Sequence, residues 1–384
     1  MSGKKIFSEI DSLSDKYIKI WEDVSNIESP TSFKDGVDRC GEYFADLARQ
    51  KGFEVDYSRQ EVSGDAICIT MNRGAKGVPV VFSGHIDTVH AVGSFGSPAT
   101  KIVDGKIYGP GVCDCKGGVV AGLMAMESLA QAGFTDRPVK LIIQSDEEVG
   151  SSYSKKSTIK YMCDNSKDAA VFVNLEPYNN GFATMSRKGI IGFNFEVTGI
   201  EGHSSKCATL GANAIIDAAH KMMELDKIKD NDGITCNVAK VQGGTLRNII
   251  PGKCRFETDF RFMTNEQFEY ICKFVKDLAA TVHVEGCKCT VNEPGSPRPA
   301  MELTDFNVKA FERMNQVFAK NGLPELKMFR GLGGSDAAYT TQEGIPTIDS
   351  LGVEGGFIHS ADEYAVLSSL AECAKRLVAI ALDY

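Results

Sequence analysis

Residues 139 to 148 read V-K-L-I-I-Q-S-D-E-E, an apolar run followed by acidic residues. The first part of this segment, Val139 to Ser145, is an apolar run of the length of a buried strand, and three acidic residues follow it directly. Adjacent carboxylates such as Glu147 and Glu148 repel each other, and burying them at a strand end is costly unless cations accompany them. The segment therefore predicts a strand that delivers acidic side chains to a cation site.

Other apolar runs end in the same kind of residue. These runs and the polar residues that follow them are Val78 to Ser83 with His85 and Asp87, Ala169 to Leu175 with Glu176, and Ile345 to Leu351 with the glycine-rich loop around His359. Helical patterns over Lys116 to Ala132 and Asp305 to Phe318 alternate with the runs, which predicts an α/β fold with a mostly parallel sheet. In such sheets ligands bind beyond the carboxyl ends of the strands, so we expect these loops to converge on one site.

A segment of different character interrupts this pattern. It has two predicted strands and two predicted helices: Ile190 to Val197, Cys254 to Phe262, Asn213 to Leu225 and Asn265 to Ala280. A proline-rich connector, Pro294 to Pro299, follows it. We therefore expect an inserted α+β domain over residues 188–299, with the catalytic domain formed by residues 1–187 and 300–384.

Composition excludes several classes of protein. The 384 residues are 43% apolar and 24% charged, as in ordinary globular proteins, and their net charge of −9 leaves no basic field for nucleic acid. No run approaches the roughly 18 apolar residues of a membrane span. Charged residues interrupt the first 22 positions, unlike a signal peptide, and the 12 scattered cysteines indicate reduced thiols. We expect a cytoplasmic protein without nucleic-acid or membrane partners.

Each site residue has a plain structural explanation when taken alone. His85 and Asp87 could be a surface pair instead of a metal ligand and the carboxylate that fixes its tautomer. Asp114 stands directly before a predicted helix, where it could serve as an N-cap. Taken together, however, several His and carboxylate groups at the ends of separate strands predict a metal site, because such oxygen and nitrogen ligands suit Zn²⁺, Co²⁺ or Mn²⁺.

The order of the motifs resembles that of the co-catalytic dizinc peptidases, the family of glutamate carboxypeptidase, peptidase T and acetylornithine deacetylase. The matching blocks are S-G-H-I-D-T-V (83–89), Y-G-P-G-V-C-D-C-K-G-G (108–118), S-D-E-E-V-G-S (145–151), N-L-E-P (174–177), G-G-S-D-A-A-Y (333–339) and the His359 loop. The resemblance covers nearly the whole chain, and the residues of the motifs are most similar to those of the glutamate carboxypeptidase branch. It implies a ferredoxin-like inserted domain that pairs two chains.

The resemblance also implies roles for individual residues. One ion of a zinc pair would bind His85, Asp114 and Glu176, and the other would bind Asp114, Glu148 and His359. Glu147 would be the general base and Asp87 the partner of His85. The chain departs from the family at Cys115, where Asp or Met is common.

Further implied residues lie outside the metal ligands. His203 would stabilise the oxyanion from the partner subunit of a homodimer, and Asn248 and Arg261 would contact substrate. Arg330 matches the arginine that binds the substrate carboxylate, a task that suits a planar guanidinium. The expected substrate is a small peptide or N-acyl amino acid with a free C-terminal carboxylate.

Other functions remain as alternatives. The segment Gly333 to Ala337 lacks the last glycine of G-x-S-x-G, and no G-x-G-x-x-G opens a helix after an early strand. A cysteine hydrolase built on Cys113 or Cys115 is a minor alternative. An inert metal- or peptide-binding homologue would gain nothing from Glu147 as a base. An N-acyl amino acid deacylase and an aminopeptidase of the peptidase T type stay open, because they would use the same metals and base.

Overall fold

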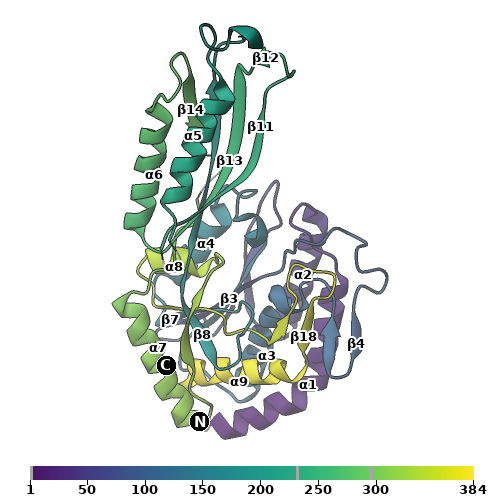
Figure 1. The fold of residues 1–384 in the computed structure, drawn as a ribbon. Coiled ribbons are helices and arrows are strands. Elements are labelled where there is room, and N and C mark those ends of the chain that lie inside the picture. The colour runs from purple at the N-terminus through teal and green to yellow at the C-terminus, as the bar shows by residue number, and fades with distance from the viewer. Residues whose placement is uncertain (1–2, 231–232, 294–296) are drawn as a thin grey trace. The chain divides into compact units, whose positions relative to one another are not determined.

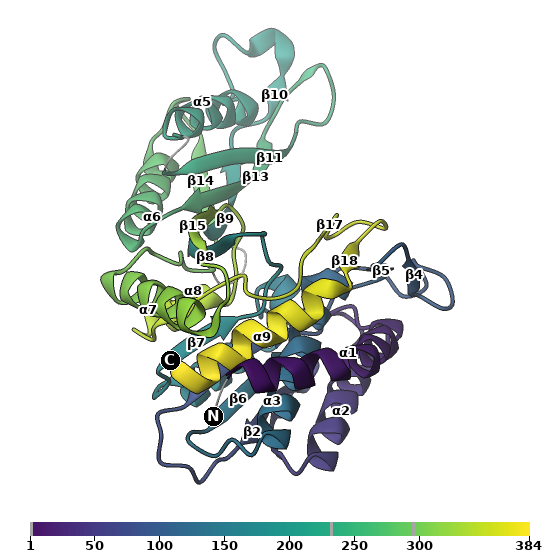
Figure 2. The same ribbon diagram turned by 90° about the horizontal axis from the view of Figure 1, so that it is seen from below.

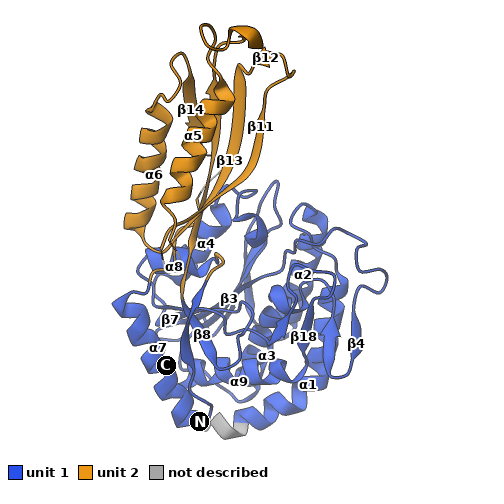
Figure 3. Ribbon diagram, in the orientation of Figure 1, with its two compact units in different colours: residues 1–185, 303–331, 335–384 blue, residues 186–302, 332–334 orange. Residues whose placement is uncertain are grey.

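The computed structural model describes residues 3–230, 233–293 and 297–384, which form two compact units (Figure 3). Unit 1 comprises residues 1–185, 303–331 and 335–384, and unit 2 comprises residues 186–302 and 332–334. The inserted segment expected over residues 188–299 falls within unit 2. Residues 294–296 of the expected proline-rich connector lie outside the described residues.

A six-stranded sheet forms the centre of unit 1 (Figure 1). Its strands, in spatial order, are β1 (Glu54–Ser58), β2 (Ala66–Met71), β6 (Val139–Gln144), β3 (Val80–His85), β7 (Val171–Asn174) and β16 (Thr347–Ile348). The pairs β3–β6, β3–β7 and β7–β16 are parallel, and β2 is antiparallel to both β1 and β6. Only β2 therefore runs against the other five strands, in agreement with the expected mostly parallel sheet.

Helices cover both faces of this sheet. They are α1 (Gly3–Asn26), α2 (Lys34–Gln50), α3 (Gly117–Gln131), α4 (Ser157–Ser166), α7 (Asp305–Asn321), α8 (Ala337–Gln342) and α9 (Ser368–Asp383). Figure 2 shows α1, α3 and α9 packed together. Alternate residues of one strand face opposite layers: Val80 and Phe82 pack in the core of α1, α3 and α9, whereas Val81 packs with residues of α4. Burial on both faces explains why these strands are continuous apolar runs.

A small sheet beside this core holds two loops close together. Its strands, in spatial order, are β17 (Gly355–Gly356), β18 (Tyr364–Val366), β5 (Lys106–Tyr108) and β4 (Lys101–Val103). The His359 loop connects β17 to β18, and the segment with Asp114 follows β5. Because Tyr364 pairs with Tyr108 across β18 and β5, these two loops start from neighbouring strands.

Unit 2 has the ferredoxin-like order of elements, strand–helix–strand–strand–helix–strand. These elements are β9 (Gly189–Thr198), α5 (Ala214–Lys227), β11 (Thr235–Gly243), β13 (Lys253–Phe262), α6 (Asn265–Ala280) and β14 (Lys288–Asn292). The strands form one antiparallel sheet in the order β11-β13-β9-β14. Along β9 and β13 every second residue is buried in a core of its own, so one face of the sheet packs against the helices.

Two expected strands have different bounds in the structure. The strand expected over residues 345–351 is only the two residues of β16, since Ser350 takes a left-handed conformation with φ 62° and turns the chain. The strand expected over residues 78–83 ends two residues later, so that His85 is the last residue of β3. All 12 cysteines are free thiols. Among the described residues, no helix is long and apolar enough to cross a membrane.

Candidate metal centre

His85 ends β3 inside unit 1, with only 2% of the residue exposed. Its Nε2 atom lies 3.1 Å from Asp114 Oδ1 and 3.7 Å from Glu176 Oε1. On the other side of the ring, Nδ1 lies 3.1 Å from the carbonyl oxygen of Asp87 and 3.4 Å from its Oδ1. An Nδ1–H donated to Asp87 would leave Nε2 as a lone-pair donor facing two carboxylates, the arrangement typical of a metal-bound imidazole.

Asp114 lies between two imidazoles. It belongs to the short η1 segment (Val112–Lys116), which joins β5 to α3. Its Oδ1 is 3.1 Å from His85 Nε2, and its Oδ2 is 3.3 Å from His359 Nε2. The N-cap of α3 is Lys116, so the alternative of Asp114 as a helix cap is wrong. A carboxylate with one oxygen on each of two histidines is placed to bridge two cations.

Glu148 completes the second side of this cluster. It lies in the η2 turn (Glu147–Val149) directly after β6, and its Oε2 is 3.2 Å from His359 Nε2. The His359 side chain is 52% exposed, whereas those of Asp114 and Glu148 are 8% and 7% exposed. Its backbone is left-handed, with φ 63°. The cluster is therefore buried on the side of His85 and open on the side of His359.

Asp87 connects the two sides of the cluster. Its side chain is fully buried, and its Oδ1 and Oδ2 accept hydrogen bonds from the backbone N–H groups of Glu147 and Glu148, at 3.1 and 3.2 Å. Thr31 donates a further hydrogen bond of 2.7 Å to Oδ2. Asp87 thus contacts the imidazole of His85 through its carbonyl oxygen and its carboxylate, and the same carboxylate fixes the turn that carries the two glutamates.

Glu363 has a similar role on the opposite side and was not among the residues expected from the sequence. It is 1% exposed, and its carboxylate accepts hydrogen bonds from the backbone N–H groups of Gly111, Cys113 and Asp114, at 3.2, 2.9 and 3.1 Å. Its Oε2 also lies 3.1 Å from His90 Nε2. A lone Glu four residues after His359 gives no signal in the sequence, because its partners come from a segment about 250 positions earlier.

The electrostatics of the cluster favour positive charge between its carboxylates. Burial opposes the charge of Asp114, but hydrogen bonds from His359 and His85 outweigh it and hold the pKa of Asp114 below its usual range. Hydrogen bonds to Asp114 and then to Glu148 raise the pKa of His359 to about 10. Burial raises the pKa of Glu148 to about 6, against the effect of its bond with His359. A divalent cation would supply the same positive charge.

The donor atoms are close enough together to hold metal ions. Ligand atoms of His85, Asp114 and Glu148 all lie within 4.8 Å of one another, as do those of His85, Cys115 and Glu176. Imidazole and carboxylate donors in this number fit divalent ions such as Zn²⁺. The structure thus brings together all five residues expected as ligands, His85, Asp114, Glu148, Glu176 and His359, and adds the thiol of Cys115.

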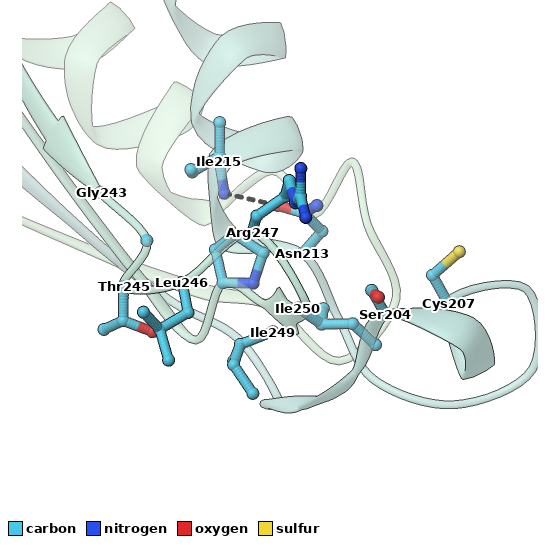
Figure 4. A pocket seen from close by; sticks show the side chains of 12 residues that line it. Ser204, Cys207, Asn213, Ile215, Gly243, Thr245, Leu246, Arg247, Ile249 and Ile250 are labelled. Carbon is cyan, nitrogen blue, oxygen red and sulfur yellow. Dashed lines mark hydrogen bonds between the residues drawn. The ribbon is translucent and has the colours of Figure 1, made fainter.

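Two further expected residues lie together in unit 2. His203 is in β10 (Gly202–His203), which pairs with β12 (Ile249–Ile250), and the backbone of the next residue, Ser204, donates a 2.9 Å hydrogen bond to the carbonyl oxygen of Asn248. Beside them is a hollow of about 510 Å³ whose lining includes Arg247 (Figure 4). The His203 side chain is exposed, and its Nδ1 lies 2.8 Å from Ser205 Oγ, which leaves Nε2 for another partner.

The two expected substrate arginines lie on different strands. Arg261, in β13, forms a two-pronged ion pair with Asp259, with Nε–Oδ1 at 2.7 Å and Nη2–Oδ2 at 3.1 Å. A role in substrate binding would require this pair to open. Arg330 is exposed on β15 (Lys327–Gly331), which pairs with β8 (Phe182–Arg187).

Comparison with known proteins gives consistent matches over most of the chain. Residues 81–383 match the model of peptidase family M20/M25/M40. The chain is 28% identical over 360 residues to carboxypeptidase G2 of a Pseudomonas species, covering 92% of this chain and 85% of that protein. It is 26% identical over 368 residues to succinyl-diaminopimelate desuccinylase of Nitrosospira multiformis, covering 89% and 91%.

Solved structures share the fold. Aminopeptidase PepT of Bacillus cereus superposes with a TM-score of 0.79 at 21% identity, covering 96% of this chain and 98% of that chain. A tripeptidase of Staphylococcus aureus gives a TM-score of 0.77 at 20% identity, covering 96% and 97%.

Proposed function

The chain belongs to peptidase family M20/M25/M40, and we propose that it is a dinuclear zinc carboxypeptidase acting on small peptides or N-acyl amino acids. Membership in this family makes it a metal-dependent hydrolase of peptide or amide bonds. The observation that carries the proposal is the position of Asp114 between His85 and His359, with Glu148 and Glu176 beside them.

The residues of the cluster divide into two ligand sets that share Asp114. His85 and Glu176 would hold one ion with Asp114 Oδ1, and His359 and Glu148 would hold the other with Oδ2, as the distances of 3.1 to 3.7 Å support. When bound, two such ions supply Lewis acidity that polarises a scissile carbonyl and acidifies an attacking water. Zn²⁺ is our choice of metal, with Co²⁺ or Mn²⁺ as substitutes.

The proton transfers fall to Glu147. It lies next to the ligand Glu148 in the same turn, and Asp87 holds the backbone N–H of both residues. Glu147 would take a proton from the attacking water and pass it to the leaving amine, as a general base that becomes a general acid. The base is thus fixed to the metal site by the backbone that carries the ligand.

Specificity would come from residues outside the metal ligands. We assign Arg330 to the free α-carboxylate of the substrate, with Arg261 and Asn248 as further substrate contacts. The similarity to carboxypeptidase G2 supports this reading, and the similarity to a desuccinylase supports the runner-up, an N-acyl amino acid deacylase. A required α-amine would instead indicate an aminopeptidase.

We further propose a homodimer in which unit 2 pairs the chains and His203 acts on the oxyanion in the partner's site. The exposed side chain of His203 and the exposed edge strand β11 support this arrangement. The 12 unpaired cysteines fit a reducing compartment, and we place the enzyme in the cytoplasm. Its net charge of −9 offers no field for nucleic acid.

Matched substrates test the carboxypeptidase assignment. Peptides with a free C-terminal carboxylate should be cleaved with about 10- to 150-fold higher kcat/KM than the same peptides amidated, since a charge-assisted pair is worth about 1.5–3 kcal/mol. Arg330→Ala should remove most of this ratio, and Lys327→Ala, which deletes another exposed cation of β15, should keep it. Equal cleavage of both peptides by the wild type would show that the clamp does not exist.

A further inference from the structure

Cys115 directly follows Asp114 in the chain and lies beside the candidate metal ligands. Its side chain is fully buried, and its sulfur lies 3.0 Å from the backbone nitrogen of His85 and 3.5 Å from the carbonyl oxygen of the same residue. The sulfur and ligand atoms of His85 and Glu176 all lie within 4.8 Å of one another. The thiol is therefore close to the donors of one of the two proposed ions.

The strand beside the sulfur makes room for it. A Cβ atom added to Gly84 would lie 3.2 Å from Cys115 Sγ and 2.9 Å from Val119 Cγ2, too close for either neighbour to stay in place. Gly84 directly precedes His85 at the end of β3. The absence of a side chain there lets the sulfur approach the strand that carries the imidazole.

The neighbouring thiol of Cys113 has a different environment. It is also fully buried in η1, but its sulfur faces the carbonyl oxygen of Val353 at 4.0 Å, and it belongs to neither group of donors. The chain thus contains two buried thiols two residues apart, of which only one is near the proposed metal ligands.

Resting on the proposed dinuclear centre, we propose that the Cys115 thiolate is a fourth protein ligand of the ion held by His85, Asp114 and Glu176, which leaves the open position for the attacking water on the ion held by Asp114, Glu148 and His359. Donors around tetrahedral zinc with one sulfur are about 3.3–3.5 Å apart, given bonds of about 2.0 Å to N or O and 2.3 Å to S. The observed 3.1 and 3.7 Å separations between His85 and the two carboxylates are close to this range, and the sulfur lies within 4.8 Å of donor atoms of His85 and Glu176. Binding would release the thiol proton to solvent.

A thiolate in this set has a consequence for metal choice. Thiolates favour zinc, whereas sites built from carboxylates and water suit manganese and magnesium. This half of the centre should therefore discriminate more strongly between Zn²⁺ and Mn²⁺ than the same site with a carboxylate at position 115. The site with His359, Glu148 and Asp114 has no sulfur donor among its proposed ligands and should discriminate less.

Cobalt substitution tests the proposal without reference to activity. Wild-type protein loaded with two Co²⁺ per chain should show a sulfur-to-cobalt charge-transfer band in the near ultraviolet, beside the visible bands that report bound cobalt. The matched control Cys113→Ser should keep the band. Cys115→Ser should lose it while the visible bands persist. In zinc–manganese competition, Cys115→Asp should lower the preference for Zn²⁺ by about tenfold or more, the scale on which changes around a metal site alter affinity.

A measurement on the wild type alone guards against a variant that fails to fold. Zinc-edge X-ray absorption of protein with two Zn²⁺ per chain should contain sulfur at about 2.3 Å, averaging half a sulfur per zinc. If two ions bind but have only nitrogen and oxygen neighbours, and no charge-transfer band appears, Cys115 is not a ligand. The proposal of a dinuclear centre would still hold. Failure to bind two ions at all would overturn both proposals.

Discussion

At the scale of a single residue, the buried carboxylate of Asp87 contacts both His85 and the turn that carries Glu147 and Glu148. The family resemblance implies that Asp87 is the partner of His85, and its Oδ1 lies 3.4 Å from the imidazole Nδ1. Its hydrogen bonds to the backbone of Glu147 and Glu148 could not be predicted, because they link β3 to the end of β6 across the sheet edge. Local spacing gives the residue types of such a site, and only the fold gives the contacts between them.

Because Glu147 is the proposed base and its neighbour Glu148 the proposed metal ligand, the two functions can be separated by mutation. Glu147→Gln keeps the size of the side chain and removes only its ability to accept a proton, so it should retain near two metal ions per chain. Its kcat/KM should fall by about 10²- to 10⁴-fold, the usual contribution of a general base. Metal analysis and steady-state kinetics measure the two effects. The control Glu148→Gln should lose metal as well as activity, and a Glu147→Gln enzyme with more than about a hundredth of wild-type kcat/KM would not depend on this base.

At the scale of elements, the η1 segment depends on Glu363 for its position. This carboxylate accepts hydrogen bonds from three backbone N–H groups of residues 111–114. It therefore holds Asp114 between the two histidines. Glu363→Gln should weaken these hydrogen bonds and lower metal affinity by about 10- to 100-fold, as is usual when the partners of metal ligands are changed. Competition with a chelator measures that affinity. The exposed neighbour Asp362 provides the control Asp362→Asn, which should bind metal like the wild type. Equal affinity in both variants would refute the positioning role.

The helices behind the sheet are joined by Glu127 of α3. It accepts hydrogen bonds from Lys16 Nζ and Tyr17 Oη of α1, at 2.6 and 2.5 Å, and pairs with Lys51 at the end of α2 at 2.9 Å. Burial works to raise the pKa of Glu127, but these partners outweigh it, so the pKa in the folded protein is lowered. A lowered pKa means that the carboxylate stabilises the fold above the unfolded pKa of about 4.3, and that this stability is lost as pH falls through the folded pKa.

Glu127→Gln should therefore lower the free energy of unfolding by about 1–3 kcal/mol at pH 7. The difference from the wild type should shrink below about pH 4.3, where the carboxyl becomes protonated first in the unfolded chain and, at lower pH, in the folded protein. Urea unfolding at pH 7, 5 and 3 measures this trend. Glu61→Gln, at an exposed position, should change stability little at any of these pH values. A difference that stayed constant with pH would exclude the charge of Glu127 as its cause.

Most elements that the sequence revealed are apolar strand runs or helices with strong helical periodicity. Strands β9 and β13 were recognised although only one of their faces is buried, and β2 was not predicted although all six of its residues are buried. The strands β6 and β7 were recognised because most of their residues are apolar, and the helix α6 was recognised because its apolar residues recur at helical spacing. Strands β11 and β14 were not predicted, because most residues of β11 are exposed and its sequence, T-C-N-V-A-K-V-Q-G, has few large apolar residues. Such strands are specified by the partners in their sheet and not by their own composition.

At the scale of the whole molecule, the proposed site residues are divided between the two units. The five expected metal ligands and Glu147 belong to unit 1, whereas His203, Asn248 and Arg261 belong to unit 2. The change in pattern near residues 188 and 299 led us to expect a domain boundary at each of these positions. The sequence could not predict which chain a unit 2 residue serves, because that depends on pairing between surfaces. The proposed homodimer assigns His203 to the partner's site.

Subunit mixing distinguishes donation between chains from donation within one chain. His203→Ala and Glu147→Gln are each expected to be inactive alone. In a mixed dimer, the site of the His203→Ala chain keeps its Glu147 and would receive His203 from its partner, so one of the two sites is complete. Random exchange of equal amounts puts half of the dimers in this form, and the mixture should recover about a quarter of wild-type activity.

The matched control mixes His203→Ala chains with chains that carry both substitutions, where no site can be complete and no activity should return. Subunit exchange is measured separately with differently labelled chains. An inactive mixture is informative only if heterodimers have formed. If labelled heterodimers form and the mixture of single variants remains inactive, His203 does not act across the interface. A monomeric wild type with full activity would exclude the arrangement as well, because the oxyanion would then have to be stabilised by groups of one chain.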